Sequence, residues 1–208
     1  MAVIHISRQF GAGGYTLGQA LAKRLDYQFV SRSIINRMAR EAEVSPAWVE
    51  GVEKEAGGWV NRLTRFLVSS DFVERHVGES RSDFDENRYI EFLKRLLPSM
   101  AAEGNIVIIG RGGQYILPDD PGTVKIFLVA EFEERVDFIQ DLWKVEREDA
   151  ARAIHARQKR SESFLKGLGS KRPEDPTLYH LVVNSSMVPL ELAETLILDL
   201  VRRGKTDA

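Results

Sequence analysis

Short apolar runs rich in β-branched residues alternate with longer helical patterns along this chain of 208 residues. The run at residues 105–110 (NIVIIG) is apolar at nearly every position, which is typical of a parallel strand covered on both faces. Strands that alternate with helices form a parallel sheet between helical layers. The order of these runs therefore predicts an α/β fold.

The same patterns predict the individual elements. Strands are predicted at residues 3–7, 27–30, 105–110, 124–129 and 181–184. Helices are predicted at residues 17–25, 131–142, 145–165 and 189–203. The segment from 33 to about 100 is helical in pattern nearly throughout, with Ser45 as an N-cap and Pro46 at the first helical position.

The stretch SRQFGAGGYTLG (residues 7–18) joins the first strand to the first helix. Its glycines allow backbone N–H groups to point at a phosphate, and the helix N-terminus adds unpaired donors and a positive dipole end. In the P-loop pattern G-x-x-x-x-G-K-[ST], a lysine bridges the outer phosphates and a hydroxyl holds magnesium. With Gly13 at the second glycine, the other positions hold Arg8, Gly14 and Tyr15, so the pattern fails there. A tight turn without a ligand is the alternative interpretation.

We predict phosphate binding by Arg8 and by the loop residues Gly11, Ala12, Gly13, Gly14, Tyr15 and Thr16. Thr16, one residue late, is the nearest aliphatic hydroxyl for Mg²⁺. The dinucleotide pattern G-x-G-x-x-G fits less well, because its third glycine would fall on Thr16.

Composition excludes several function classes. Lys and Arg number 29 and Asp and Glu number 31, so the net charge of −2 gives no argument for nucleic acid or an anionic membrane as partner. The absence of Cys excludes disulfides, thiolate catalysis and cysteine metal sites, and the four His show no metal-binding spacing. Since no apolar run spans a bilayer and no signal pattern opens the chain, we expect a cytoplasmic protein.

Three stretches carry a family resemblance. Residues 105–135 (NIVIIGRGGQYILPDDPGTVKIFLVAEFEER) resemble the part of bacterial cytidylate kinases that runs from a strand through Gly-Arg-Asp to a second strand and a Glu-Arg helix. The opening ISRQFGAGG is similar to that of the cytidylate kinase-like proteins, in which I-S-R-[QE]-[FY]-G-[SA]-G-G replaces the lysine-bearing loop. ARAIHARQKRSESFL and DPTLYHLVVNSS resemble the lid helix and final strand of that group. The family resemblance is weakest over residues 40 to 90.

The resemblance implies a three-layer αβα P-loop kinase fold with a five-stranded parallel sheet. It implies a single domain over residues 1–208, with a helical monophosphate-binding insertion at about 33–100 and a lid at about 145–175. The implied reaction, with ATP and Mg²⁺, transfers a phosphoryl group to a nucleoside monophosphate such as CMP or dCMP. Such a reaction needs two phosphates in line and charge neutralisation around the transferred oxygens.

The same resemblance assigns roles to four arginines, whose planar forks grip phosphate. Arg111 and Arg37 match the positions that hold the monophosphate, and Arg157 and Arg160 match the lid arginines. Arg8 stands between the first strand and the glycines. From this position we hypothesise that it reaches the phosphates from the other side of the loop and replaces the missing lysine. A surface role for Arg111 and a solvated helix position for Arg37 are the alternatives.

The chain also departs from the cytidylate kinase pattern. Gly14 replaces the lysine, Gly112 replaces the acid that helps to read cytosine, and Ser7 and Ser31 replace acids that follow strands. These departures leave three hypotheses: a kinase for a nucleoside monophosphate or a related small acceptor, a nucleotide sensor without turnover, or a scaffold without a ligand.

Residues 58–76 (GWVNRLTRFLVSSDFVERH) place apolar side chains near helical spacing. Packing against the core is the default interpretation of this stripe. A partner surface that supports a homodimer is the alternative.

Overall fold

The computed structural model of the chain describes residues 2–31, 34–36 and 86–204. Arg37, the stripe at residues 58–76 and most of the expected insertion lie outside the described residues. The predictions made for them stay predictions.

Five parallel strands form one sheet in the order β2-β3-β1-β4-β5. The strands are β1 (Val3–Arg8), β2 (Gln28–Val30), β3 (Ile106–Ile109), β4 (Thr123–Val129) and β5 (Leu181–Asn184). At the centre, Ile4 of β1 pairs with Val107 on one side and Val124 on the other. The predicted parallel sheet is confirmed, and each strand lies within one residue of its predicted bounds.

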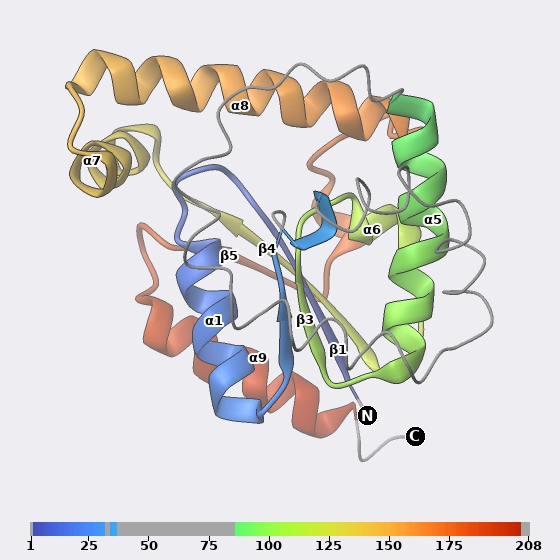
Figure 1. The fold of residues 1–208 in the computed structure, drawn as a ribbon. Coiled ribbons are helices and arrows are strands. Elements are labelled where there is room, and N and C mark those ends of the chain that lie inside the picture. Colours follow the sequence, from blue (N-terminus) through green and yellow to red (C-terminus); the bar gives the residue numbers. More distant parts are fainter. Residues whose placement is uncertain (1, 32–33, 37–85, 205–208) are drawn as a thin grey trace.

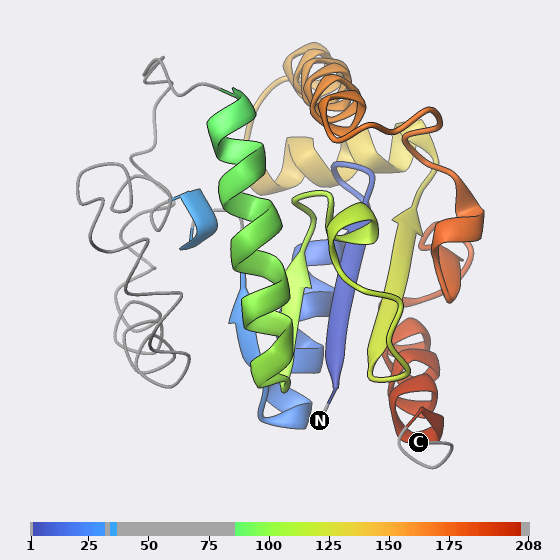
Figure 2. The same ribbon diagram turned by 90° about the vertical axis from the view of Figure 1, so that its right-hand side faces the viewer.

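Helices cover both faces of the sheet (Figures 1 and 2). On one face, α1 (Gly14–Leu25) and α9 (Leu190–Arg203) pack over the side chains of Ile4 and Ile6. On the other face, α5 (Glu86–Glu103) contacts β3 and α6 (Gly113–Ile116) contacts β1. The alternation of β1 residues between two hydrophobic cores thus makes the three layers. The short helix α6 was not predicted, because four residues show no helical period.

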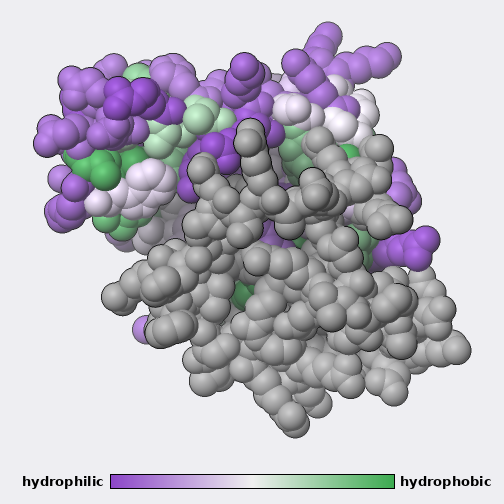
Figure 3. All heavy atoms as spheres, turned by 45° about the horizontal axis from the view of Figure 1, so that its top comes forward, coloured by the Kyte–Doolittle hydropathy of each residue, from purple (hydrophilic) through white to green (hydrophobic). Residues whose placement is uncertain are grey.

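Two further helices, α7 (Phe132–Trp143) and α8 (Arg147–Gly167), lie beyond the carboxyl ends of the strands (Figures 1 and 2). α8 buries Ala150, Ile154 and Leu165, and its outer surface is largely hydrophilic (Figure 3). A 3₁₀ turn, η2 (Pro176–Leu178), leads from α8 into β5. Ligands of open α/β sheets bind at the carboxyl ends of the strands, so α8 lies over the expected site.

The predicted helices agree with the structure to within three residues, and α1 differs most because it begins already at Gly14. In the described ranges, no helix combines the length and apolarity needed to cross a bilayer.

Candidate nucleotide and acceptor site

The glycine loop between β1 and α1 has the backbone of an anion site. Gly11 (φ 93°) and Gly13 (φ 78°) adopt the left-handed conformation, and Gly13 is the N-cap of α1. Since glycine has no side chain, it caps none of the first amides of the helix. Those N–H groups and the helix dipole are what a phosphate needs at this position.

Close packing explains why the loop is glycine-rich. A Cβ atom on Gly11 would lie 2.9 Å from Cβ of Arg135 on α7, and one on Gly13 would lie 2.9 Å from Cδ1 of Leu190 on α9. The loop therefore runs between α7 and α9 without room for side chains. Ser185, which follows β5, donates a hydrogen bond to the Ala12 carbonyl (3.1 Å) and helps to fix the loop.

Arg8 fills the space that a lysine at position 14 would need. A Cβ on Gly14 would lie 2.9 Å from Cγ of Arg8, and a Cβ on Gly110 would lie 2.3 Å from its Nη1. The aliphatic part of Arg8 thus lies against the start of α1, and its guanidinium reaches the turn after β3. Both glycines make room for this arginine, whose guanidinium lies at Gly110.

Arg111 is held at the edge of the same site. Its backbone is left-handed (φ 64°), between Gly110 (φ 69°) and Gly112 (φ 68°). Its Nη1 donates to the Tyr89 hydroxyl (2.9 Å), and its guanidinium carbon lies 5.6 Å from the Tyr89 ring centroid and 5.9 Å from that of Phe164. The left-handed backbone of a residue other than glycine is strained, and such strain is concentrated at functional sites.

A buried polar layer supports the turn that carries Arg111. His5 Nε2 donates to the Gly110 carbonyl (3.0 Å), and Ser7 donates to Oε1 of Gln114 (3.0 Å). The buried Lys125 donates to the Leu117 carbonyl (3.1 Å) and to Asp119 (2.6 Å), which lowers the pKa of the Asp119 carboxyl.

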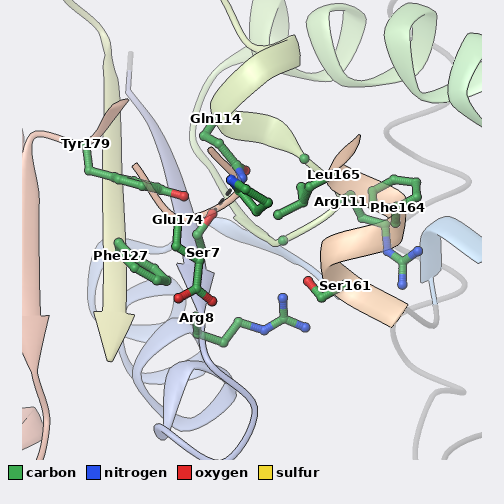
Figure 4. Close-up of a pocket in the computed structure, with 13 residues that line it drawn as sticks. Ser7, Arg8, Arg111, Gln114, Phe127, Ser161, Phe164, Leu165, Glu174 and Tyr179 are labelled. Atoms are coloured by element: carbon green, nitrogen blue, oxygen red, sulfur yellow. Dashed lines mark hydrogen bonds between the residues drawn. The ribbon is translucent and has the colours of Figure 1, made fainter. Parts of the chain in front are cut away.

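A pocket of about 40 Å³ lies beside this layer, at the carboxyl ends of β1, β3 and β4 (Figure 4). Burial raises the pKa of Tyr179 in its wall to about 12, so the phenol is neutral at physiological pH. In Figure 4, Ser7, Glu174 and Tyr179 lie on one side and Arg111, Ser161 and Phe164 on the other, with Arg8 below. The lining residues are Ser7, Arg8, Gly110, Arg111, Gly112, Gln114, Phe127, Ser161, Phe164, Leu165, Pro173, Glu174 and Tyr179.

The structure brings Arg8 and Arg111 together in the pocket, while the two lid arginines lie on the exposed surface of α8. The guanidinium carbon of Arg157 lies 4.5 Å from the ring centroid of Phe10 in the glycine loop and 5.4 Å from that of Trp143. Arg160 is outside the pocket lining. Their predicted contact with the transferred group stays a prediction.

The predicted metal ligand Thr16 is exposed in the first turn of α1, whereas the ring of Tyr15 packs edge-on against Phe29 (5.1 Å). Among the described residues, no three His, Asp or Glu side chains gather as a metal site. Mg²⁺ commonly keeps several waters and binds through substrate phosphates with few protein oxygens. The exposed hydroxyl of Thr16 is compatible with such an ion, and its role as a metal ligand stays a prediction.

Sequence reasoning missed three residues of the site. Arg135 is 6% exposed and lies against Gly11, with burial lowering its pKa and the charge of Glu174 raising it. Gln9 accepts from the Ala130 amide (3.2 Å) and donates to Oε2 of Glu174 (3.2 Å). The sequence did point to Arg135, because it is the arginine of the Glu-Arg stretch that resembles the family. No feature of the sequence distinguished Glu174 from the other charged residues of its polar segment.

The sequence profile of the cytidylate kinase-like family matches residues 3–187. The chain belongs to the cytidylate kinase-like family. Its sheet order, with helices on both faces and a glycine loop after the central strand, is that of the three-layer P-loop kinase fold. None of the curated proteins compared with the chain matches it in sequence.

Several solved structures are similar to the chain at low sequence identity. An uncharacterized protein from Eubacterium ventriosum ATCC 27560 is 15% identical, with a TM-score of 0.66 over 97% of this chain and 99% of that one. A shikimate kinase from Bacteroides thetaiotaomicron is 16% identical, with a TM-score of 0.48 over 97% and 98% of the two chains. A gluconokinase from Sinorhizobium meliloti 1021 is 13% identical, with a TM-score of 0.47 over 99% and 94%.

Proposed function

We propose that this protein transfers the γ-phosphoryl group of ATP to a small acceptor, either a nucleoside monophosphate such as CMP or dCMP or a related molecule. The observation that carries the proposal is the placement of Arg8. Its stem occupies the space of the missing lysine beside a glycine loop with left-handed Gly11 and Gly13, and its guanidinium lies at the turn after β3, where Arg8 lines the pocket. A loop that had lost phosphate binding has no need of this replacement.

The chain's own groups then have defined tasks. The amides from Gly11 to Thr16 hold the phosphates of ATP, and Arg8 neutralises the charge that spreads over the transferred oxygens. Arg111 holds an anionic group of the acceptor, and Arg157 and Arg160 approach when α8 closes over the site. Mg²⁺, bound with ATP and supported by Thr16, supplies further charge neutralisation.

Two measurements test the proposal. Calorimetry with MgATP compares the wild type with Arg8→Ala and with Lys23→Ala, an exposed cation of α1 that serves as the matched control. We expect Arg8→Ala to abolish ATP binding and Lys23→Ala to leave it unchanged. Unchanged affinity in Arg8→Ala contradicts the assigned role of Arg8.

An ATP-consumption assay over a panel of nucleoside monophosphates separates the kinase from the sensor. Turnover supports the kinase, whereas ATP-dependent thermal stabilisation without any turnover identifies a nucleotide sensor. The proposal includes the cytoplasmic location expected from the sequence. The homodimer stays a prediction that light scattering tests.

A further inference from the structure

Glu174 places a carboxylate in the pocket that Arg8 and Arg111 also line. It follows α8 and lines the pocket with Arg8 and Arg111, and Figure 4 shows its carboxylate on the side that faces Arg8. Its Oε2 accepts a hydrogen bond from Nε2 of Gln9, which is the residue directly after Arg8. The carboxylate therefore lies next to the glycine loop, where the transferred phosphoryl group is expected.

Contacts on both sides of Glu174 hold it there. The Tyr115 hydroxyl of α6 donates to the Arg172 carbonyl (2.9 Å). Asp175 accepts hydrogen bonds from the amide (3.0 Å) and hydroxyl (2.6 Å) of Thr177 and so caps η2. Its position in the pocket is thus a consequence of the fold on each side of it.

A carboxylate at this place suits one class of acceptor better than another. The attacking oxygen of a nucleoside monophosphate is already anionic, so it needs no base and is repelled by a neighbouring carboxylate. A hydroxyl must lose its proton as it attacks, and a carboxylate within hydrogen-bond reach accepts that proton. Glu174 therefore favours a hydroxyl over a phosphate as the attacking group.

Two other features of the pocket also favour an acceptor other than a cytidine monophosphate. Gly112 stands where cytidylate kinases carry the acid that reads cytosine, and a Cβ there would lie 2.0 Å from Cδ1 of Leu168. Leu168, the C-cap of α8, thus has to shift before a side chain fits there, and the left-handed backbone of Gly112 (φ 68°) disfavours one. The wall beside Glu174 instead carries two neutral hydroxyl groups, that of Tyr179 and that of Ser7, which donates to Gln114.

We infer that the acceptor is a small hydroxyl-bearing anion, that Arg111 holds its anionic group, and that Glu174 accepts the proton of the attacking hydroxyl. The inference rests on the proposed ATP-dependent phosphoryl transfer. In the step, the acceptor oxygen bonds to the γ-phosphorus while the bond from that phosphorus to the β,γ-bridging oxygen breaks. The electron pair stays on ADP, and the proton moves to the Glu174 carboxylate and then to solvent.

Water, as the smallest hydroxyl acceptor, provides a test that does not require the acceptor's identity. ADP release with MgATP alone is measured for the wild type, for Glu174→Gln and for Glu134→Gln, an exposed acid of α7 outside the pocket. We expect Glu174→Gln to lower ADP release by about 100-fold or more, the usual contribution of a general base. The Kd of ATP and the Mg²⁺ concentration for half-maximal rate should change less than about twofold, and Glu134→Gln should match the wild type.

Other results overturn the inference. CMP or dCMP that stimulates ADP release by the wild type shows that a phosphate is the acceptor. An unchanged rate in Glu174→Gln, or ATP binding without any ADP release by the wild type, excludes proton transfer to Glu174. A raised Mg²⁺ requirement in Glu174→Gln identifies a metal ligand instead. Failure of ATP to bind to any of the three proteins contradicts the proposed function itself and is seen by calorimetry alone.

Discussion

Arg8 and Gly14 share one volume at the mouth of the glycine loop, so their identities are coupled. A lysine at position 14 has to displace the stem of Arg8, whose Cγ lies 2.9 Å from the required Cβ. We expect Gly14→Lys alone to lower the free energy of unfolding by about 1–3 kcal/mol, as overpacking does, and to weaken ATP binding. The double variant Arg8→Gly/Gly14→Lys restores the glycine and lysine of the usual loop, and we expect it to bind ATP more tightly than Arg8→Gly. Calorimetry and urea unfolding measure both effects, and a double variant no better than Arg8→Gly contradicts the coupling.

At the scale of elements, α8 carries its arginines in two different surroundings. Arg157 is stacked on Phe10 and Trp143, whereas Arg160 lies one turn nearer to the pocket residue Ser161. We expect Arg160→Ala to lower kcat by at least about 100-fold with little change in the Kd of ATP, because a lid arginine acts on the transition state. Arg157→Ala should also weaken ATP binding, since it loses its contact with the loop. The exposed Arg152→Ala is the matched control, and equal kinetics for Arg160→Ala and Arg152→Ala would exclude a lid role for Arg160.

Helices and strands with a clear hydrophobic period could be predicted from the sequence, whereas their exact ends and the short elements between them were harder to predict. β3 and β4 were found because buried parallel strands are apolar in nearly every position. The start of α1 was placed three residues late, since Gly14 is a poor helix former and the packing of the loop, rather than propensity, sets that boundary. Short elements such as α6 depend on the left-handed turn before them, which no local pattern predicts.

At the scale of the whole molecule, the site depends on contacts between distant parts of the chain. The loop and Arg111 were predictable because each lies in a local motif directly after a strand. Glu174 and its partner Gln9 are 165 residues apart, and only the return of the chain from α8 to β5 brings them together. A single sequence records no such pairing, and this is why the carboxylate in the pocket was missed.

The buried His5 of the central strand makes the stability of the whole molecule depend on pH. Burial lowers its pKa to about 4, with Lys125 and Arg8 acting in the same direction and the hydrogen bond to Gly110 opposing them. Its Nδ1 finds no hydrogen-bond partner within the part of the chain that the structure describes. The native state therefore holds a neutral His5, while the unfolded chain takes up a proton at its ordinary pKa of 6.5. The free energy of unfolding is therefore highest with respect to His5 above pH 6.5, and it decreases as the pH falls from 6.5 toward 4.

Between pH 7 and pH 5, this linkage lowers the free energy of unfolding by about 2 kcal/mol. We expect the His5→Gln variant, whose side chain does not titrate, to lack this part of the pH dependence. Urea unfolding of both proteins at the two pH values gives the difference directly. Equal losses in both proteins would show that the pKa of His5 is not lowered in the native state, which contradicts the inferred effect of burial.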